Sequence, residues 1–171
     1  MNTITDLELD QYIKKYSTSG EMKRIIIHCS ATKCDQEYSA KDIKKWHLER
    51  GFNDIGYHFI IKLDGTIELG RTLDKIGAHA KDFNKGSIGI CYIGGLNAKG
   101  KPEDTRTDAQ KESLLKLLKA IKKYINITKI MGHRDLSKDL NGNGIIEPNE
   151  YMKDCPCFDV QKEYTSIWQR F

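Results

Sequence analysis

Two histidines and a cysteine, far apart in this 171-residue chain, are the side chains best suited to hold a catalytic metal ion. They are His28, His133 and Cys155. Two imidazoles and a thiolate are good Zn²⁺ ligands, and three protein ligands leave the fourth tetrahedral position to water, as in catalytic zinc sites. No short ligand spacing joins the three, and an isolated histidine is more often a packed or surface residue. The residue types alone leave both interpretations open.

A second candidate cation site lies between His133 and Cys155. The segment DLNGNGIIEPNE (139–150) fits the calcium-loop pattern D-x-[DN]-x-[DN]-G-x₅-E. Its oxygen ligands would come from the side chains at loop positions 1, 3, 5 and 12 and the carbonyl at position 7: Asp139, Asn141, Asn143, Glu150 and Ile145. A calcium loop of this kind lies between two helices, and Pro148 limits an early second helix. A polar, turn-rich loop without calcium is therefore the alternative.

Alternating strand and helix patterns around these residues predict one α/β domain with a central mixed sheet flanked by helices. The expected strands are 24–28, 57–63, 66–70, 87–94 and 127–131, with a two-residue hairpin turn at Asp64-Gly65. Capping boxes at Ser39 and Thr107 begin two amphipathic helices, and further helices are expected at 4–17 and 159–171. His28 then lies at the end of a buried strand, and His133 follows another strand.

The composition excludes several classes of protein. The formal net charge is +4 with the basic residues scattered, so we expect no nucleic-acid partner. No apolar run is long enough to cross a bilayer, so we expect no membrane partner. The N-terminal segment MNTITDLELDQY does not resemble a signal peptide, so we expect synthesis in the cytoplasm. The five cysteines are an odd number, which favours reduced thiols or metal ligands over a disulfide framework. A monomer is the default expectation.

Six segments, in order along the chain, resemble the zinc-dependent type 2 N-acetylmuramoyl-L-alanine amidases. They are RIIIHCSAT (24–32), GYHFIIKLDGTIELGR (56–71), IGAHAK (76–81), SIGICYIGG (87–95), GHRD (132–135) and KDCPCFD (153–159). The family includes the short lysozyme-type endolysins of phages and is similar to animal peptidoglycan recognition proteins. The resemblance covers residues 23 to 168 and implies the fold of that family.

The resemblance implies that His28, His133 and Cys155 are zinc ligands. The family motif has the ligand cysteine directly before a proline, which selects Cys155 over Cys157. Animal relatives that lack this cysteine resemble binding proteins more than enzymes, and this chain retains it. The resemblance therefore implies a zinc enzyme that hydrolyses the amide between N-acetylmuramic acid and L-alanine of peptidoglycan.

Further roles follow from the same alignment of motifs. The catalytic tyrosine of the family falls on Tyr57, and a catalytic lysine falls on Lys153, two residues before the zinc cysteine. His79 falls on a position that lines the cleft, which suggests a substrate contact, with a buried structural imidazole as the alternative. The resemblance implies Zn²⁺ as the cofactor, whereas Ca²⁺ is expected only from the pattern of the 139–150 loop, where the chain departs from the shorter endolysins of the family.

The predicted organisation is an N-terminal extension, 1–22, followed by an amidase domain, 23–171, with an insertion at 136–152 that carries the calcium-type loop. The favoured function is a phage or prophage endolysin that acts on the cell wall after release or export. The alternatives are a non-catalytic peptidoglycan-binding module and a calcium-sensing interaction protein.

Overall fold

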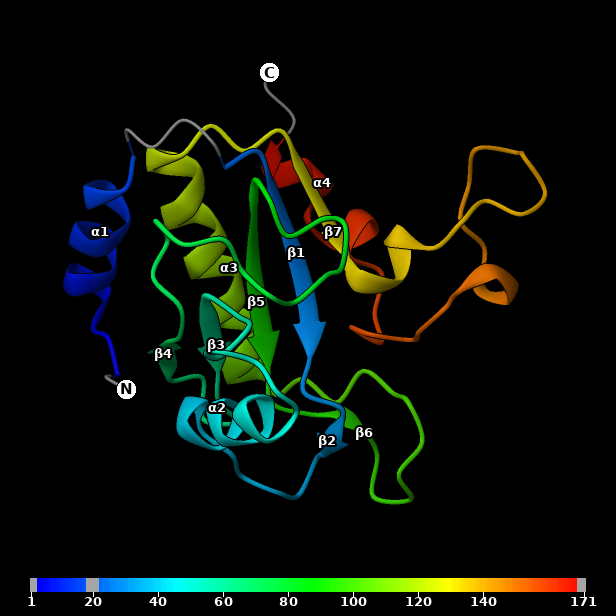
Figure 1. The fold of residues 1–171 in the computed structure, drawn as a ribbon, viewed down its shortest axis with the longest axis horizontal. Helices are drawn as coiled ribbons and strands as arrows, with labels where there is room; N and C mark the ends of the chain where they lie inside the picture. The colour runs from blue at the N-terminus through cyan, green and yellow to red at the C-terminus, as the bar shows by residue number, and fades with distance from the viewer. Residues whose placement is uncertain (1–2, 18–21, 169–171) are drawn as a thin grey trace.

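A mixed β-sheet lies at the centre of the computed structural model, which describes residues 3–17 and 22–168. Its strand order is β4-β3-β5-β1-β7, and β2 and β6 form a separate small pair (Figure 1). The strands are β1 (Arg24–Cys29), β2 (Thr32–Lys33), β3 (Phe59–Ile61), β4 (Ile67–Leu69), β5 (Ser87–Tyr92), β6 (Gly95–Leu96) and β7 (Lys129–Gly132). The α-helices are α1 (Asp6–Lys15), α2 (Ala40–Glu49), α3 (Asp108–Tyr124) and α4 (Val160–Trp168), and 3-10 turns span His133–Leu136 and Pro148–Glu150.

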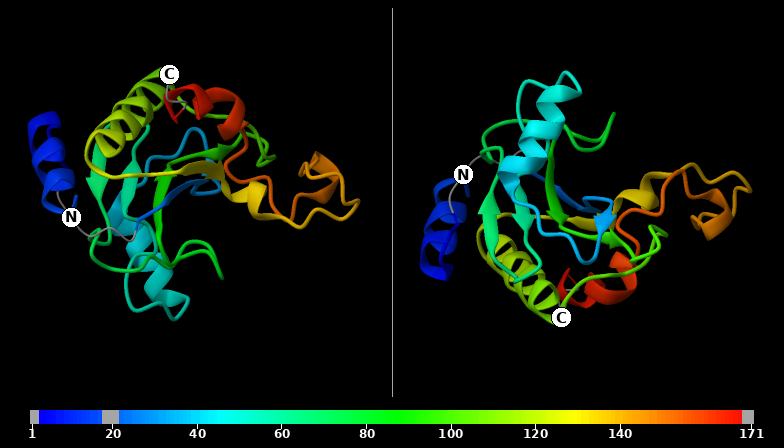
Figure 2. Two further views of the ribbon diagram at one scale, coloured as in Figure 1. Left: turned by 90° about the horizontal axis from the view of Figure 1, so that it is seen from above. Right: turned by 90° about the horizontal axis from the view of Figure 1, so that it is seen from below.

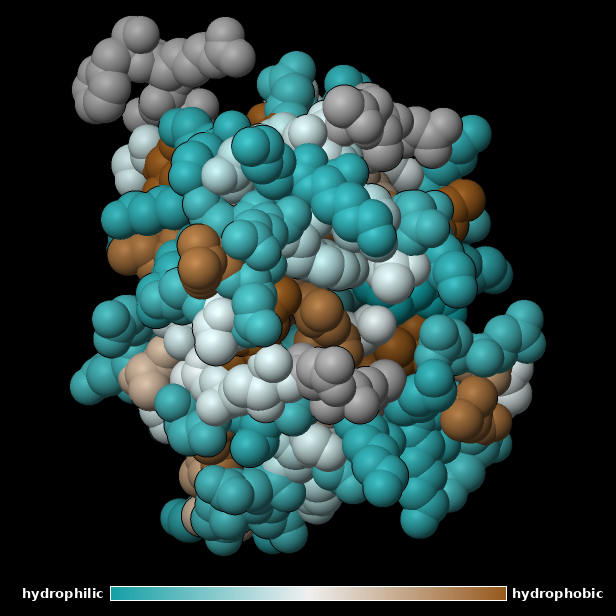
Figure 3. Space-filling view, turned by 90° about the vertical axis from the view of Figure 1, so that its left-hand side faces the viewer, coloured by the Kyte–Doolittle hydropathy of each residue, from teal (hydrophilic) through white to brown (hydrophobic). Residues whose placement is uncertain are grey.

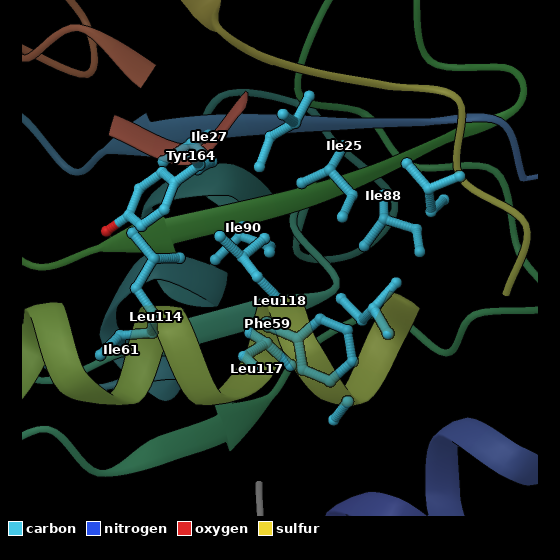
Figure 4. Close-up of a cluster of buried hydrophobic side chains, with 14 of the residues drawn as sticks. Ile25, Ile27, Phe59, Ile61, Ile88, Ile90, Leu114, Leu117, Leu118 and Tyr164 are labelled. Atoms are coloured by element: carbon cyan, nitrogen blue, oxygen red, sulfur yellow. The ribbon is translucent and has the colours of Figure 1, made fainter. Parts of the chain in front are cut away.

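The central strand β1 pairs in parallel with β5 on one side and β7 on the other, and only the β3–β4 pair is antiparallel among the described strands. Side chains alternate between the two faces of a strand. Ile25 and Ile27 of β1 pack with Leu117 and Leu118 of α3 in the main core (Figure 4). His28 therefore points to the opposite face.

Helices cover both faces of the sheet, as Figure 2 shows: α3 and α4 lie on one face and α2 on the other. Leu114, Leu117 and Leu118 of α3 are buried at 1% exposure or less. On the other face, Ile43 of α2 packs with Ile60 of β3 in a smaller cluster. The predicted α/β architecture is confirmed by this arrangement.

The N-terminal helix α1 packs beside α3. Its buried side chains, Leu9 and Ile13, join the main core, and ion pairs from Asp6 to Lys116 and from Asp10 to Lys123 connect the two helices. The face that carries α1 is mainly hydrophilic, with apolar patches between polar side chains (Figure 3). The predicted boundary at residue 22 stays a prediction, because residues 18–21 lie outside the described part.

Most predicted elements are present, but the hairpin turn differs from the expected one. The predicted strands 57–63 and 66–70 are shorter, and the turn spans Lys62 to Gly65, where the Gly65 N–H donates to the Lys62 carbonyl at 2.9 Å. Gly65 has a φ of +84°, so it follows the turn as a left-handed residue, as in hairpins with a glycine bulge. The prediction of a two-residue Asp64-Gly65 turn is therefore wrong by one residue.

Three further sequence-based expectations concern the C-terminal helix, membrane spans and the predicted insertion. The helix predicted over 159–171 is described as α4 to Trp168, and residues 169–171 lie outside the described part. No helix in the described ranges is long and apolar enough to cross a membrane. The segment predicted as an insertion, 136–152, extends away from the body of the fold in every view (Figures 1 and 2).

The burial of α1 predicts that it unfolds together with the domain. Ile13 is fully buried and Leu7 is 71% exposed on the same helix. We expect Ile13→Ala to lower the free energy of unfolding by about 2–5 kcal/mol. The control Leu7→Ala should change it by less than about 0.5 kcal/mol. Urea denaturation followed by circular dichroism measures both, and equal small effects would show that α1 is not part of the cooperative unit.

Candidate metal centre

The two predicted ligand histidines are brought together by the parallel pairing of β1 with β7. In this register Ile27 lies opposite Gly132, so the next residue of each chain segment is a histidine, His28 and His133. The Nδ1 atoms of the two rings are 3.0 Å apart. Residues that are far apart in sequence thus meet at the carboxyl ends of two adjacent strands.

Cys155 reaches the same place from the segment after the insertion. Its carbonyl accepts the Arg134 N–H at 2.7 Å, and its Sγ accepts the Cys29 N–H at 3.3 Å. The next residue, Pro156, is held by its carbonyl, which accepts the Tyr92 hydroxyl at 2.6 Å. These bonds connect the segment to the 3-10 turn after β7 and to β1 and β5, and they set Sγ 3.9 Å from His28 Nδ1.

The donor atoms of His28, His133 and Cys155 all lie within 4.8 Å of one another. Bonds of about 2.0–2.3 Å to one tetrahedral Zn²⁺ would place such donors about 3.3–3.7 Å apart. The observed separations of 3.0 and 3.9 Å are close to those values. The set of two imidazoles and a thiol also suits zinc chemically, so the residues present fit the ion.

Burial keeps both histidines in the neutral form that a metal requires. It lowers the pKa of His28 well below the usual range, and repulsion from the other histidines, His79 and His133, in their protonated forms and from the Lys153 charge lowers it further. Burial and the Lys153 charge lower the pKa of His133 to about 4. Both rings are therefore uncharged at neutral pH.

Cys157, the competing thiol, lies on the other side of Cys29. Its Sγ is 3.9 Å from Cys29 Sγ and donates to the Gly95 carbonyl at 3.3 Å. The contact with Cys29 and burial raise the pKa of Cys157, which keeps it a thiol. The structure therefore groups Cys155, and not Cys157, with the two histidines.

Tyr57 lies beside the candidate metal ligand His28, just before β3. Its ring centre is 5.1 Å from that of His28. Burial raises the pKa of the Tyr57 hydroxyl well above its usual range, so the group stays protonated and can donate a hydrogen bond. Lys153 is exposed, and its charge acts on both His28 and His133. Tyr57 and Lys153, the predicted catalytic residues, therefore both lie close enough to influence the candidate metal ligands.

His79 is buried against His28, at 8% exposure. Its Nδ1 is 3.0 Å from His28 Nε2, and its Nε2 is 3.3 Å from the Ser87 hydroxyl. Burial lowers the pKa of His79 to about 3, so this ring is also neutral. The predicted substrate contact is not tested by these bonds, which give both ring nitrogens a partner inside the protein.

The 139–150 loop closes on itself through its polar side chains. The Asp139 carboxylate accepts the N–H groups of Gly142 and Gly144, and the Glu150 carboxylate accepts those of Leu140, Asn141 and Glu147. The side chains of Asn141 and Asn143 accept the N–H two residues later in each case. A 3-10 turn at His133–Leu136 precedes the loop and another, Pro148–Glu150, forms its last three residues, whereas an EF-hand loop has an α-helix on each side. Calcium binding stays a prediction that these bonds do not test.

Ser87 and Asn84 are residues at the site that the sequence analysis did not single out. Ser87 is fully buried at the start of β5, and the Asn84 side chain accepts the N–H groups of His79 and Ala80, both at 2.8 Å. A serine at the start of a strand and an asparagine in a loop have common structural explanations. Only their contact with His79 in the folded structure shows that Ser87 and Asn84 belong to the site.

Comparisons with known proteins identify relatives of this chain. A chain described as an endolysin, from Klebsiella phage KP32, is 39% identical over 152 residues, which covers 89% of both chains. Peptidoglycan-recognition protein LB of Drosophila melanogaster is 39% identical over 132 residues, covering 68% of this chain and 53% of that protein. The structure of the N-acetylmuramoyl-L-alanine amidase LysC from Clostridium intestinale superposes with a TM-score of 0.66 at 26% identity, covering 87% of each chain.

The family model described as N-acetylmuramoyl-L-alanine amidase (Amidase_2) matches residues 18–157, a span that includes His28, His133 and Cys155. This match covers most of the chain. The protein therefore belongs to the N-acetylmuramoyl-L-alanine amidase family.

Proposed function

We propose that this chain is a zinc-dependent endolysin that hydrolyses the amide between N-acetylmuramic acid and L-alanine in bacterial peptidoglycan. The observation that carries the proposal is the cluster of His28, His133 and Cys155 donor atoms within 4.8 Å, in a chain of this amidase family. The relatives support the substrate class, because the phage chain is described as an endolysin and the insect chain as a peptidoglycan-recognition protein.

The three clustered side chains would hold the ion and leave one tetrahedral position free. Bound there, Zn²⁺ would supply Lewis-acid polarisation of the amide carbonyl and lower the pKa of a water molecule towards ~7. The neutral state of His28 and His133 leaves their lone pairs ready for this role. The thiol of Cys155 would release its proton on binding.

The protein side chains would stabilise the charge that develops on the substrate oxygen. Tyr57 holds a protonated hydroxyl beside His28, which can donate to an oxyanion. Lys153 adds a positive charge near the same ligands. Because neither group is a ligand in this proposal, both can be changed while the metal stays bound.

The metal dependence is tested directly on purified peptidoglycan. We expect release of stem peptides with a free L-alanine amino terminus, detected by mass spectrometry. Release should stop when zinc is removed with a chelator and return when Zn²⁺ is added back. A folded, zinc-loaded protein that releases no product would contradict the amidase proposal and favour a non-catalytic peptidoglycan-binding module.

Tyr57→Phe and Lys153→Ala test the two catalytic roles. Loss of one donor to an oxyanion lowers kcat by about 10²- to 10³-fold in other enzymes, and we expect effects of that order. Zinc content, measured by atomic absorption, should stay at the wild-type level. Tyr38→Phe and Lys41→Ala are matched controls, since both side chains lie near or on α2 and outside the cluster. Near wild-type rates in both test variants would refute the roles.

Calcium binding by the 139–150 loop is a separate prediction of this proposal. The sequence pattern predicts a binding heat when chelator-treated protein is titrated with Ca²⁺ in a calorimeter. The Asp139→Ala, Glu150→Ala double variant should lose that heat, because it removes the carboxylates at both ends of the loop. Equal heats in the two proteins would exclude calcium binding at this loop.

A further inference from the structure

The ring of His79 packs against His28 in a space that two glycine residues leave open. Gly77 and Gly89 lie against the ring, and a Cβ atom on either glycine would collide with it. Gly89 of β5 pairs with Ile26 of β1, and Ile26 is two residues before His28. Because these strands leave room for an imidazole beside His28, the contact between the two histidines is part of the fold.

The hydrogen bonds around His79 determine where its proton lies. The Ser87 hydroxyl has one proton and donates it to the Asn84 carbonyl at 2.9 Å. Ser87 Oγ, 3.3 Å from His79 Nε2, can therefore only accept at that contact. A neutral His79 that donates from Nε2 has an unprotonated Nδ1.

The proton on His79 in turn determines which nitrogen of His28 is protonated. The unprotonated His79 Nδ1 lies 3.0 Å from His28 Nε2, so His28 must supply the proton for this bond. A neutral His28 that carries its proton on Nε2 has a free lone pair on Nδ1. That atom is the one that faces His133 Nδ1 and Cys155 Sγ.

We propose that His79 is the positioning residue of the metal centre: held by Ser87 and Asn84, it fixes His28 in the tautomer that offers Nδ1 to the metal. This is a different role from the substrate contact expected from the sequence. The effect of His79 on metal binding rests on the proposed zinc function. The tautomer of His28 is a property of the metal-free chain. The carboxylate or carbonyl that commonly orients a metal-bound histidine is here a second imidazole.

Zinc affinity of the full-length chain, measured by competition with a chromophoric chelator, tests the consequence. His79→Phe keeps a ring but removes the acceptor, and we expect zinc to bind about 10- to 100-fold more weakly, the range for loss of such partners. His79→Asn is the matched control, because its Oδ1 can accept from His28 Nε2–H near the place of the imidazole Nδ1. It should restore binding to within about threefold of wild type.

Long-range ¹H–¹⁵N NMR of the histidine rings tests the cause. The metal-free wild-type chain should show His28 protonated on Nε2 and His79 protonated on Nε2. Ser87→Ala, which removes the acceptor for His79, should let His79 populate both tautomers and weaken zinc binding less than His79→Phe does. If His79→Phe does not fold, the wild-type spectrum and Ser87→Ala decide the question.

Three outcomes would overturn the proposal. They are wild-type His28 protonated on Nδ1, unchanged zinc affinity in folded His79→Phe, and an equal loss in His79→Phe and His79→Asn, which would show that only ring shape matters. None of these readouts uses peptidoglycan. A chain that binds zinc as expected and releases no stem peptide would therefore contradict the proposed function and leave the role of His79 supported.

Discussion

The parallel pairing of β1 with its two neighbours is the constraint on which the site depends. The register that places Ile27 opposite Gly132 makes His28 and His133 adjacent. The register that places Ile26 opposite Gly89 opens the space that His79 fills. A slip of one residue in either pairing would turn the histidine of one strand towards the opposite face. The buried isoleucines that oppose such a slip therefore also protect the chemistry of the site.

A cluster of imidazoles inside a protein is stable only if its nitrogen atoms find partners. His58 illustrates the solution: it is fully buried, its Nδ1 accepts the Gly89 N–H, and its Nε2 contacts the Lys75 carbonyl. Burial lowers the pKa of His58 to about 4, as it lowers that of its neighbours. Main-chain groups of β5 and the adjoining loop thus satisfy the ring of His58, whereas the ring of His79 is satisfied by two side chains, the Ser87 hydroxyl and the His28 imidazole.

Much of this organisation could be predicted from the sequence, because it depends on local patterns. Apolar periodicity and the capping boxes at Ser39 and Thr107 gave α2 and α3 within a residue or two. The family motifs predicted His28, His133 and Cys155, whose donor atoms the structure brings together, and also Tyr57 and Lys153. The contact of His79 with Ser87 could not be predicted, since it depends on the packing of a loop against β5 and no sequence pattern records it.

The hairpin shows the same limit at small scale. Asp64-Gly65 correctly signals a turn, but the position of Gly65 after the turn depends on how Ile61 pairs with Ile67. A two-residue signal does not contain that register. Local chemistry therefore predicts that the chain reverses, and the sheet determines at which residue.

The bond between Arg134 N–H and the Cys155 carbonyl has a consequence for how this enzyme can vary. At 2.7 Å it closes the base of the whole segment between the two residues, so the segment leaves and re-enters the domain at one point. Doubling the length of such a closed loop costs only about 0.6 kcal/mol in chain entropy. The bond holds the candidate ligands His133 and Cys155 close to the two ends of the segment. The segment is therefore a neutral place for a sequence to grow or shrink, where new recognition elements could be acquired without rebuilding the centre they adjoin.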